Sequence, residues 1–550
     1  MTHPFVIRLL RYFGWIVLAG SVGVFFLVVI VESSGGPVSG QSLWPTPRLW
    51  RCFQATVLIA AGAACISLVL AVPPVIGLLH ARRRSQKALL LALVILPLLI
   101  MPNVFSYGWM VMAMSRSDAL RSLMDAVGWN APGAPPFKVA WILGTWLWPI
   151  PALVLVAGYR HAGATGFRLA SLDASPTVAF LRGALPEMRP ALLASAGAVF
   201  LLAANDATVS SLMMAGETWS YTIMTDAGIA LGHERPSAFM FWRSWPMMLA
   251  GATAIAWAAP GIRQMASWAG ADNVPAEMTS AQSSRWAWPL AVLVAASLAI
   301  VPIAAFVFEL WSEAEPVGAV AARAFDIYRR SALGTGLVAL LTAMGAFAIG
   351  IVVIDLYIRC RSRWIVPCLV LILLLAAAMP PELIGIALKR FYSLIGSPRH
   401  WNILDDSPFA WSAAMSVRFG WVPACVAYLL IRRMGPELLE QAKLDGAGPG
   451  QCLGYAVLPL LWRPLVAAGM IVACLTVSEV ACTVLIQPTR FFGGSLAIAI
   501  DNQMHYGRQS DVIASSLMLM SPAVAMAIAL PWVWRQPPVL HGKLTTQSRA

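Results

Sequence analysis

The sequence has very few charged residues for its length. Only 11% of its 550 residues are Asp, Glu, Lys or Arg, whereas 59% are hydrophobic. So few charged side chains cannot cover the surface of a water-soluble protein of this size. The composition therefore excludes a soluble globular protein and predicts a membrane protein.

Motifs for metal and nucleotide binding are also missing. The eight cysteines form no C-x-x-C pair, and the seven histidines form no H-x-x-x-H or H-E-x-x-H pattern. Nor does a phosphate-binding loop of the form G-x-x-x-x-G-K-S/T occur. We therefore expect no metal site, no cofactor and no enzymatic activity, and we expect that the chain does not bind ATP itself.

Twelve stretches of the chain are long and apolar enough to cross a membrane. A membrane-spanning helix needs roughly 20 mostly apolar residues. The predicted spans are 12–32, 54–79, 88–114, 139–159, 190–214, 237–259, 286–308, 332–357, 364–388, 408–431, 464–486 and 512–533. The expected fold class is an all-α polytopic membrane protein.

Basic residues gather in every second loop between these spans, and such loops lie on the same side of the membrane. Examples are HARRRSQK at 80–87, RCRSR at 359–363 and the arginine pair at 432–433. Because basic loops stay in the cytoplasm, this pattern predicts that both termini are cytoplasmic. It also explains the net charge of +13 without nucleic acid as a partner. Lys389, Arg390 and Arg399 depart from the pattern, since they fall on the predicted outer side.

The chain divides into two halves of six predicted spans each. We expect a first half at 1–262, a polar linker at 263–285 and a second half at 286–550. Both third spans carry the dipeptide Met-Pro, at 101–102 and at 379–380. Such internal repeats are typical of transporters.

An acidic residue occupies the same position in each half. Asp206 lies twenty residues after Pro186, and Glu479 lies twenty residues after Pro459. A carboxylate in an apolar span is costly unless it meets a partner or water. One interpretation is that both acids, with their neighbours Asn205 and Ser478, line a translocation pathway. The alternative is that each acid caps or braces a neighbouring helix.

A polar stretch with the sequence LEQAKLDGAGPGQCLGYAVLP lies at 439–459, between the tenth and eleventh predicted spans. We expect a short helix that ends where Gly446 supplies a C-terminal cap, since glycine tolerates positive φ. A second short helix is expected to start near Pro449 and to stop at Leu458-Pro459.

This stretch resembles the EAA loop of ATP-binding-cassette (ABC) importer permeases. The pattern E-A-A, three residues, G, nine residues, I-x-L-P is matched by Glu440, Ala442, Gly446, Leu458 and Pro459, with Asp445 beside the glycine. The first-half counterpart at 167–186 is degenerate. It has Phe167 in place of the acid and Asp173 in place of the glycine, but keeps Ser175, Pro176 and Pro186.

The resemblance implies a function and a set of partners. Two fused six-helix permease halves look like the ferric iron and thiamine importers of bacteria. A chain of this kind lies in the bacterial inner membrane. Its two loops dock on a cytoplasmic ABC ATPase dimer, and its outer face receives a periplasmic or lipid-anchored solute-binding protein. Ferric iron is the substrate that the resemblance favours, with thiamine as an alternative.

An ion-coupled secondary transporter with twelve spans is the second hypothesis. Asp206 and Glu479 would then bind protons or sodium ions. The loop at 80–90 lacks the G-x-x-x-D-R-x-G-R pattern of the major facilitator family, and the EAA-like loop has no role in such a transporter.

Overall fold

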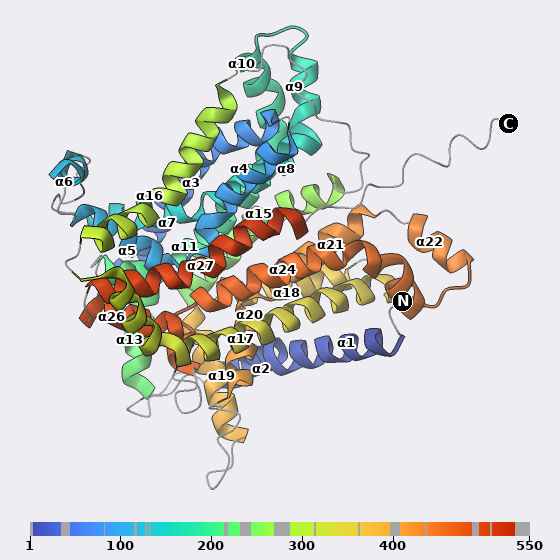
Figure 1. The fold of residues 1–550 in the computed structure, drawn as a ribbon. Coiled ribbons are helices and arrows are strands. Elements are labelled where there is room, and N and C mark those ends of the chain that lie inside the picture. The colour runs from blue at the N-terminus through green and yellow to red at the C-terminus, as the bar shows by residue number, and fades with distance from the viewer. Residues whose placement is uncertain are drawn as a thin grey trace.

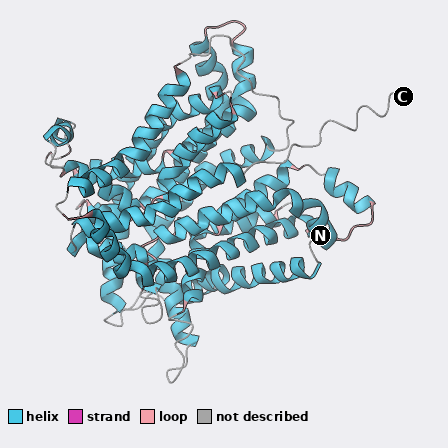
Figure 2. Ribbon diagram, in the orientation of Figure 1, coloured by secondary structure: helices cyan, strands magenta, loops and turns pink. Residues whose placement is uncertain are grey.

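The computed structural model describes residues 4–34, 45–81, 83–114, 118–126, 129, 131, 134–213, 218–231, 244–268, 286–312, 315–360, 364–395, 407–434, 437–486, 494–506 and 509–533. These residues form helices joined by short turns, and no strand occurs among them (Figures 1 and 2). The prediction of an all-α fold is therefore confirmed for this part of the chain.

The helices of the first half run as follows: α1 (Pro4–Val17), η1 (Leu18–Gly23), α2 (Val24–Ser34), α3 (Pro47–His80), α4 (Arg84–Leu99), α5 (Pro102–Ala113), α6 (Asp118–Ala126), α7 (Pro135–Leu147), α8 (Pro149–Gly158), η2 (Tyr159–Gly163), α9 (Ala164–Ala170), α10 (Pro176–Ala179), η3 (Phe180–Ala184), α11 (Leu185–Ala204), α12 (Thr208–Leu212), α13 (Trp219–Leu231) and α15 (Trp245–Trp268). The segments labelled η are π-helical turns.

The second half repeats much of this order. Its helices are α16 (Ala287–Ser312), α17 (Val317–Arg359), α18 (Ile365–Ala378), α19 (Pro381–Ile395), α20 (Pro408–Phe419), α21 (Trp421–Arg433), α22 (Glu437–Leu444), α23 (Pro449–Gln451), η4 (Cys452–Val457), α24 (Leu458–Ser478), α25 (Thr483–Ile486), α26 (Leu496–Tyr506) and α27 (Gln509–Val533). In both halves a short helical loop precedes the fifth long helix, α11 or α24.

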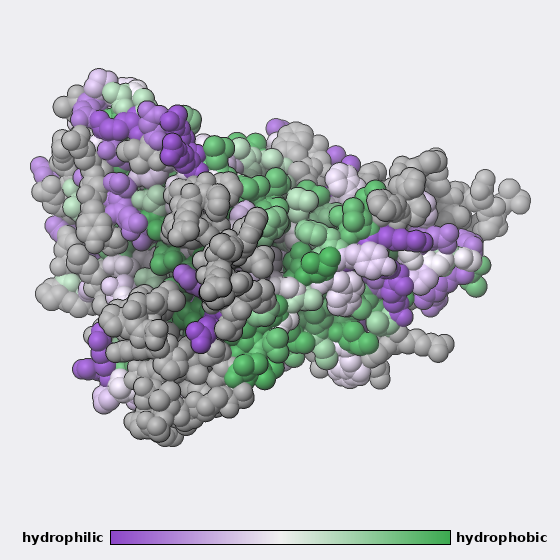
Figure 3. Space-filling model, turned by 90° about the horizontal axis from the view of Figure 1, so that it is seen from below, coloured by the Kyte–Doolittle hydropathy of each residue, from purple (hydrophilic) through white to green (hydrophobic). Residues whose placement is uncertain are grey.

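The chain is a multi-pass membrane protein. Among the described residues, seven helices are long and apolar enough to cross a membrane, and four bent helix pairs raise the number of candidate spans to as many as eleven. The predicted span 237–259 overlaps α15, which is not one of these candidates, so twelve spans remain a prediction. Large apolar side chains such as Leu58, Val69 and Leu333 are exposed, as expected where a helix faces lipid. Figure 3 shows hydrophobic residues across the middle of one face, between hydrophilic ends.

The bends of the helices repeat between the halves. The third spans break by 96° between α4 and α5 and by 101° between α18 and α19, at the two Met-Pro dipeptides. The fourth spans bend by 47° between α7 and α8 and by 49° between α20 and α21. Proline explains the breaks in the third spans, because it lacks an N–H and cannot continue a helix without strain. The predicted spans 88–114 and 364–388 are therefore each a pair of helices with a sharp bend, and each counts as one candidate span only if both helices belong to it.

The two halves exchange their first helices. α1 packs against α17 of the second half, and α16 packs against α3, α4 and α5 of the first half. Each half thus completes its packing only with a helix from the other. Of the predicted linker 263–285, residues 263–268 continue α15 and the others lie outside the described residues.

The second short helix does not stop at Leu458-Pro459, as the sequence suggested. The chain instead runs from α23 through the π-helical η4 directly into α24. Pro459 stands in the first turn of α24, where a missing N–H is tolerated, and the wider π-turn accommodates the change of hydrogen-bonding pattern. The first half has the same arrangement, since η3 leads into α11 with Pro186 in its first turn.

Candidate functional site

A cavity of about 950 Å³ lies between the two halves. Its first-half wall comes chiefly from α4, α7 and α8, and its second-half wall from α20, α21 and α24. All four candidate pathway residues, Asn205, Asp206, Ser478 and Glu479, line it. Residues that lie far apart in the sequence are therefore brought to one surface, as the pathway interpretation requires.

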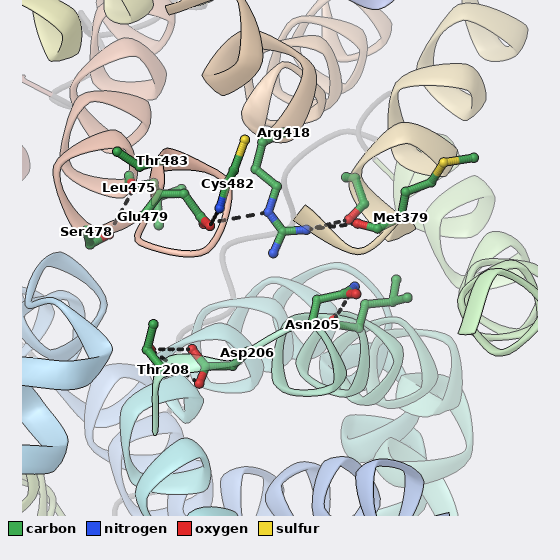
Figure 4. Close-up of polar contacts among 12 residues, drawn as sticks. Asn205, Asp206, Thr208, Met379, Arg418, Leu475, Ser478, Glu479, Cys482 and Thr483 are labelled. Atoms are coloured by element: carbon green, nitrogen blue, oxygen red, sulfur yellow. Dashed lines mark hydrogen bonds and ion pairs between the residues drawn. The ribbon is translucent and has the colours of Figure 1, made fainter. Parts of the chain in front are cut away.

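Both matched acids also accept hydrogen bonds from a following turn of the chain (Figure 4). Asp206 Oδ1 accepts from the Val209 N–H at 2.9 Å, in the first turn of α12. Glu479 Oε1 accepts from the Cys482 N–H at 3.2 Å, just before α25. Capping of this kind satisfies N–H groups that have no partner within a helix. Asp206 and Glu479 thus line the cavity and also cap a following turn, so lining a pathway and capping a helix are not exclusive roles for these two side chains.

Arg418 is a functional candidate that the sequence reading missed. It is only 5% exposed, and its Nε lies 3.8 Å from Glu479 Oε2. One of its terminal nitrogens donates to the carbonyl oxygens of Ala377 at 3.0 Å and Met379 at 3.4 Å. These carbonyls lie at the break between α18 and α19, where no helical N–H can reach them. An arginine inside the apolar stretch 408–431 was the available signal.

The break in the first half is closed by a different side chain. Trp146 on α7 donates its indole N–H to the carbonyl oxygen of Ile100 at 2.9 Å, and Ile100 lies between α4 and α5. Trp146 and Arg418 therefore both donate hydrogen bonds to backbone carbonyls at matched breaks, but only Arg418 is charged.

Asn205 joins the two halves at the acidic end of the cavity. Its amide nitrogen donates to Leu201 on its own helix at 3.0 Å and to the carbonyl oxygen of Ala378 in the second half at 3.4 Å. Its Oδ1 is buried and accepts no hydrogen bond from the described residues. Ser478 donates to the Leu475 carbonyl of its own helix at 2.9 Å.

Glu382 is a second candidate that was missed. It lies in the first turn of α19 and is fully buried, and its carboxylate accepts no hydrogen bond from any other residue in the described part of the chain. It interacts electrostatically with Glu479, Arg418 and Asp206. Three acids, Asp206, Glu382 and Glu479, therefore lie near one arginine at the same end of the cavity.

In the EAA-like loop of the second half, the first short helix, α22, ends beside Gly446, as expected. Gly446 has a φ of 79°. Its N–H bonds the Lys443 carbonyl at 3.0 Å, and the Ala447 N–H bonds the Ala442 carbonyl at 3.0 Å. This is the hydrogen-bonded helix end that favours glycine. The loop residues expected to meet a partner divide by exposure: Glu440, Asp445, Gly446 and Pro459 are exposed, Ala442 is half-buried and Leu458 is buried.

The first-half loop is built differently. Asp173 and Ser175 are exposed, Pro186 is half-buried, and Pro176 begins the short helix α10. A Cβ on Gly166 would lie 2.4 Å from the Gly183 carbonyl oxygen, so α9 and η3 touch through their backbones. The first loop thus has a close backbone contact between Gly166 and Gly183, whereas the second loop turns at positive φ at Gly446.

The two loops lie at the far ends of the helices that carry the acids. α11 has 20 residues and leads from the first loop to Asp206, and α24 has 21 residues and leads from the second loop to Glu479. At 1.5 Å per residue each loop is about 30 Å from its acid along the helix. Figure 1 shows α9 and α10 at one tip of the molecule and α22 at another.

Comparison with known proteins adds no family to this description. No protein-family model matches the chain. No curated protein matches it, and neither does any solved structure.

Proposed function

We propose that this chain is the membrane-spanning permease of a bacterial ABC importer, as two fused halves of six spans each. It translocates a small solute and takes its energy from a separate ATPase. The chain itself carries out no covalent chemistry and needs no cofactor.

The observation that carries this proposal is the link between loop and cavity. In each half one helix, α11 or α24, joins a surface loop to an acid on the cavity wall. A partner that holds both loops and changes their separation therefore moves both walls of the cavity. A switch of this kind works only when the partner binds the two states with different affinity.

The partners follow from the same arrangement. A cytoplasmic ABC ATPase dimer docks on the loops at 167–186 and 439–459. A periplasmic or lipid-anchored solute-binding protein delivers the solute to the opposite face. The spans are surrounded by inner-membrane lipid, both termini lie in the cytoplasm, and nucleic acid has no part. Ferric iron is the solute that the sequence resemblance favours, with thiamine as an alternative.

Reconstitution tests the coupling. The chain should form a complex with an ATPase subunit recognised by its own nucleotide-binding motif, and solute uptake into proteoliposomes should require ATP. Gly446→Val should abolish both complex formation and uptake, because a β-branched residue is strained at positive φ. Gly450→Ala is the matched control, since Gly450 is exposed and a Cβ there meets no atom within 4 Å. Full uptake by the Gly446→Val variant would refute the docking role.

An ion-coupled secondary transporter is the second candidate, and Glu382 is the observation that favours it. A fully buried carboxylate that no other described residue hydrogen-bonds is typical of proton-coupling sites in membranes. Uptake driven by a proton or sodium gradient without ATP would support this candidate, and loss of that uptake in Glu382→Gln would assign the coupling residue.

A further inference from the structure

The size of the cavity limits what it binds. About 950 Å³ is close to the upper end of pockets for small organic molecules. A metal ion or a simple inorganic anion would fill a small part of it and leave room for many water molecules. In addition, no group of three or more His, Cys, Asp and Glu side chains among the described residues is placed to hold a metal ion.

The walls of the cavity are mainly apolar. They include Leu91, Ile95, Ile150, Trp421 and Ile471. Such walls stabilise an apolar molecule in proportion to the area that it removes from water, but they offer nothing to a hydrated ion. The shape and the lining therefore favour an organic ligand with a hydrocarbon or aromatic body.

Charged side chains line the cavity at both ends. Asp206, Glu479 and Arg418 line the cavity near the end of α4, where Leu99 also contributes. Lys87 lines it near the start of the same helix, about 18 Å away at 1.5 Å per residue. Arg160 in η2, directly after α8, is a second cation on the wall. The acidic end is thus separated from the basic end along the length of the cavity.

The acidic end has more carboxylates than cations. Arg418 is paired with Glu479, whereas Asp206 is held by the Val209 N–H and by the Thr208 hydroxyl, which donates to Oδ2 at 3.2 Å. Glu382 adds a third carboxylate behind the wall, and the Asn205 Oδ1 beside Asp206 is a buried acceptor without a donor. A ligand that brings positive charge and N–H donors would balance this end.

We propose that the cavity is itself a selective binding site for an organic ammonium ion with an apolar body, whose N–H groups donate to Asp206. The role of this site in transport rests on the proposed function, but binding to it does not. The permease then contributes to substrate selection instead of serving as an unselective passage.

Binding to the purified chain in lipid nanodiscs, without ATPase or ATP, tests the assignment. The probes are 4-phenylbutylammonium, 4-phenylbutanol and 4-phenylbutyrate, which share a carbon skeleton and differ in charge. Ferric citrate is the fourth probe, and empty nanodiscs give the blank for isothermal titration calorimetry. We expect the ammonium ion to bind at least about tenfold more tightly than the alcohol or the carboxylate, since charge-assisted hydrogen bonds are the stronger ones.

Asp206→Asn separates the charge from the fold. The asparagine keeps an oxygen for the Val209 N–H, so the capping contact survives, whereas the negative charge is lost. We expect about tenfold weaker binding of the ammonium ion and unchanged binding of the alcohol. Asp326→Asn removes an exposed acid that does not line the cavity and should change neither.

Equal affinity for all three organic probes would overturn the proposal, and so would ammonium binding that does not depend on Asp206. Binding of ferric citrate alone, lost in Asp206→Asn, would overturn it in favour of a metal ion as the substrate. These outcomes are independent of ATP-driven uptake. If the ammonium ion does not bind but ATP-driven uptake is intact, only the proposed substrate class is refuted. If the ammonium ion binds but uptake does not depend on an ATPase, only the proposed importer function is refuted.

Discussion

The third span is broken in both halves, and a different side chain in each half donates a hydrogen bond to the carbonyls at the break. In the first half the neutral indole of Trp146 donates to the Ile100 carbonyl. In the second half the guanidinium of Arg418 donates to two carbonyls and also pairs with Glu479. A repeated backbone shape thus requires a donor at the break, but it does not fix which donor. The choice of arginine places a charge beside the cavity in one half only.

Removing Arg418 is expected to have the largest effect on this comparison. Arg418→Met leaves Glu479 without its cation and the half-buried carbonyls of Ala377 and Met379 without their donor. Breaking a buried ion pair from one side costs about 3–5 kcal/mol. The free energy of unfolding in mixed micelles, measured by titration with dodecyl sulfate, checks this.

The double variant Arg418→Met with Glu479→Gln sharpens the result. It removes the unpaired charge and should recover part of the lost stability. If Arg418→Met alone lowers the free energy of unfolding no more than a substitution of an exposed residue, then Arg418 does not stabilise the break between α18 and α19.

Trp146→Phe is expected to have an intermediate effect. It keeps most of the ring volume and removes the donor to the Ile100 carbonyl. A buried carbonyl left without its donor costs about 1–3 kcal/mol. The same unfolding titration should therefore rank Trp146→Phe between Arg418→Met and the wild type. If it equals Arg418→Met, then the charge of the arginine contributes nothing to closing the break.

The two surface loops allow a second comparison, with a smaller expected effect. Gly446→Ala places a Cβ at positive φ and should cost about 1–2 kcal/mol, with a fall in ATP-driven uptake. Asp173→Ala, at the corresponding position of the first loop, should reduce uptake less, because that side chain is exposed and its loop is held by the contact between Gly166 and Gly183. Uptake assays in proteoliposomes measure both. Equal losses would show that the loops couple equally.

Arg323→Gln is expected to have the smallest effect. Arg323 pairs with Glu315 and Asp511, and these two acids raise its pKa. Its side chain is 35% exposed, so water and salt screen the interaction. We expect no measurable change in the melting temperature at physiological salt. A change as large as that of Arg418→Met would remove the distinction between buried and exposed arginines in this protein.

Much of the fold could be predicted from local sequence. Long apolar stretches indicated the all-helical, multi-pass class, and Gly446 and Pro449 indicated the turn of the second loop. The continuation of the helix through Pro459 was not predictable by the same reasoning. Proline breaks a helix when it lies in the interior, but it is tolerated in the first turn. The π-turn before α24 places Pro459 in the first turn of α24.

The candidate site was only partly accessible from the sequence. Asp206 and Glu479 stood out because acids are rare in apolar spans and because they follow matching prolines. Arg418 and Glu382 follow no repeat, and their roles depend on a break in a helix that is distant from Arg418 in the sequence. Only a structure shows which carbonyls that break leaves without donors.

Local sequence was enough to indicate that this protein crosses the membrane many times and to predict two related halves, because apolar length and matching prolines and acids are local properties of the chain. Tertiary structure alone decided that the halves exchange α1 and α16, that the matched acids meet at one cavity, and that Arg418 stands among three carboxylates. These facts depend on packing between segments that are tens to hundreds of residues apart, for which no local pattern of residues exists.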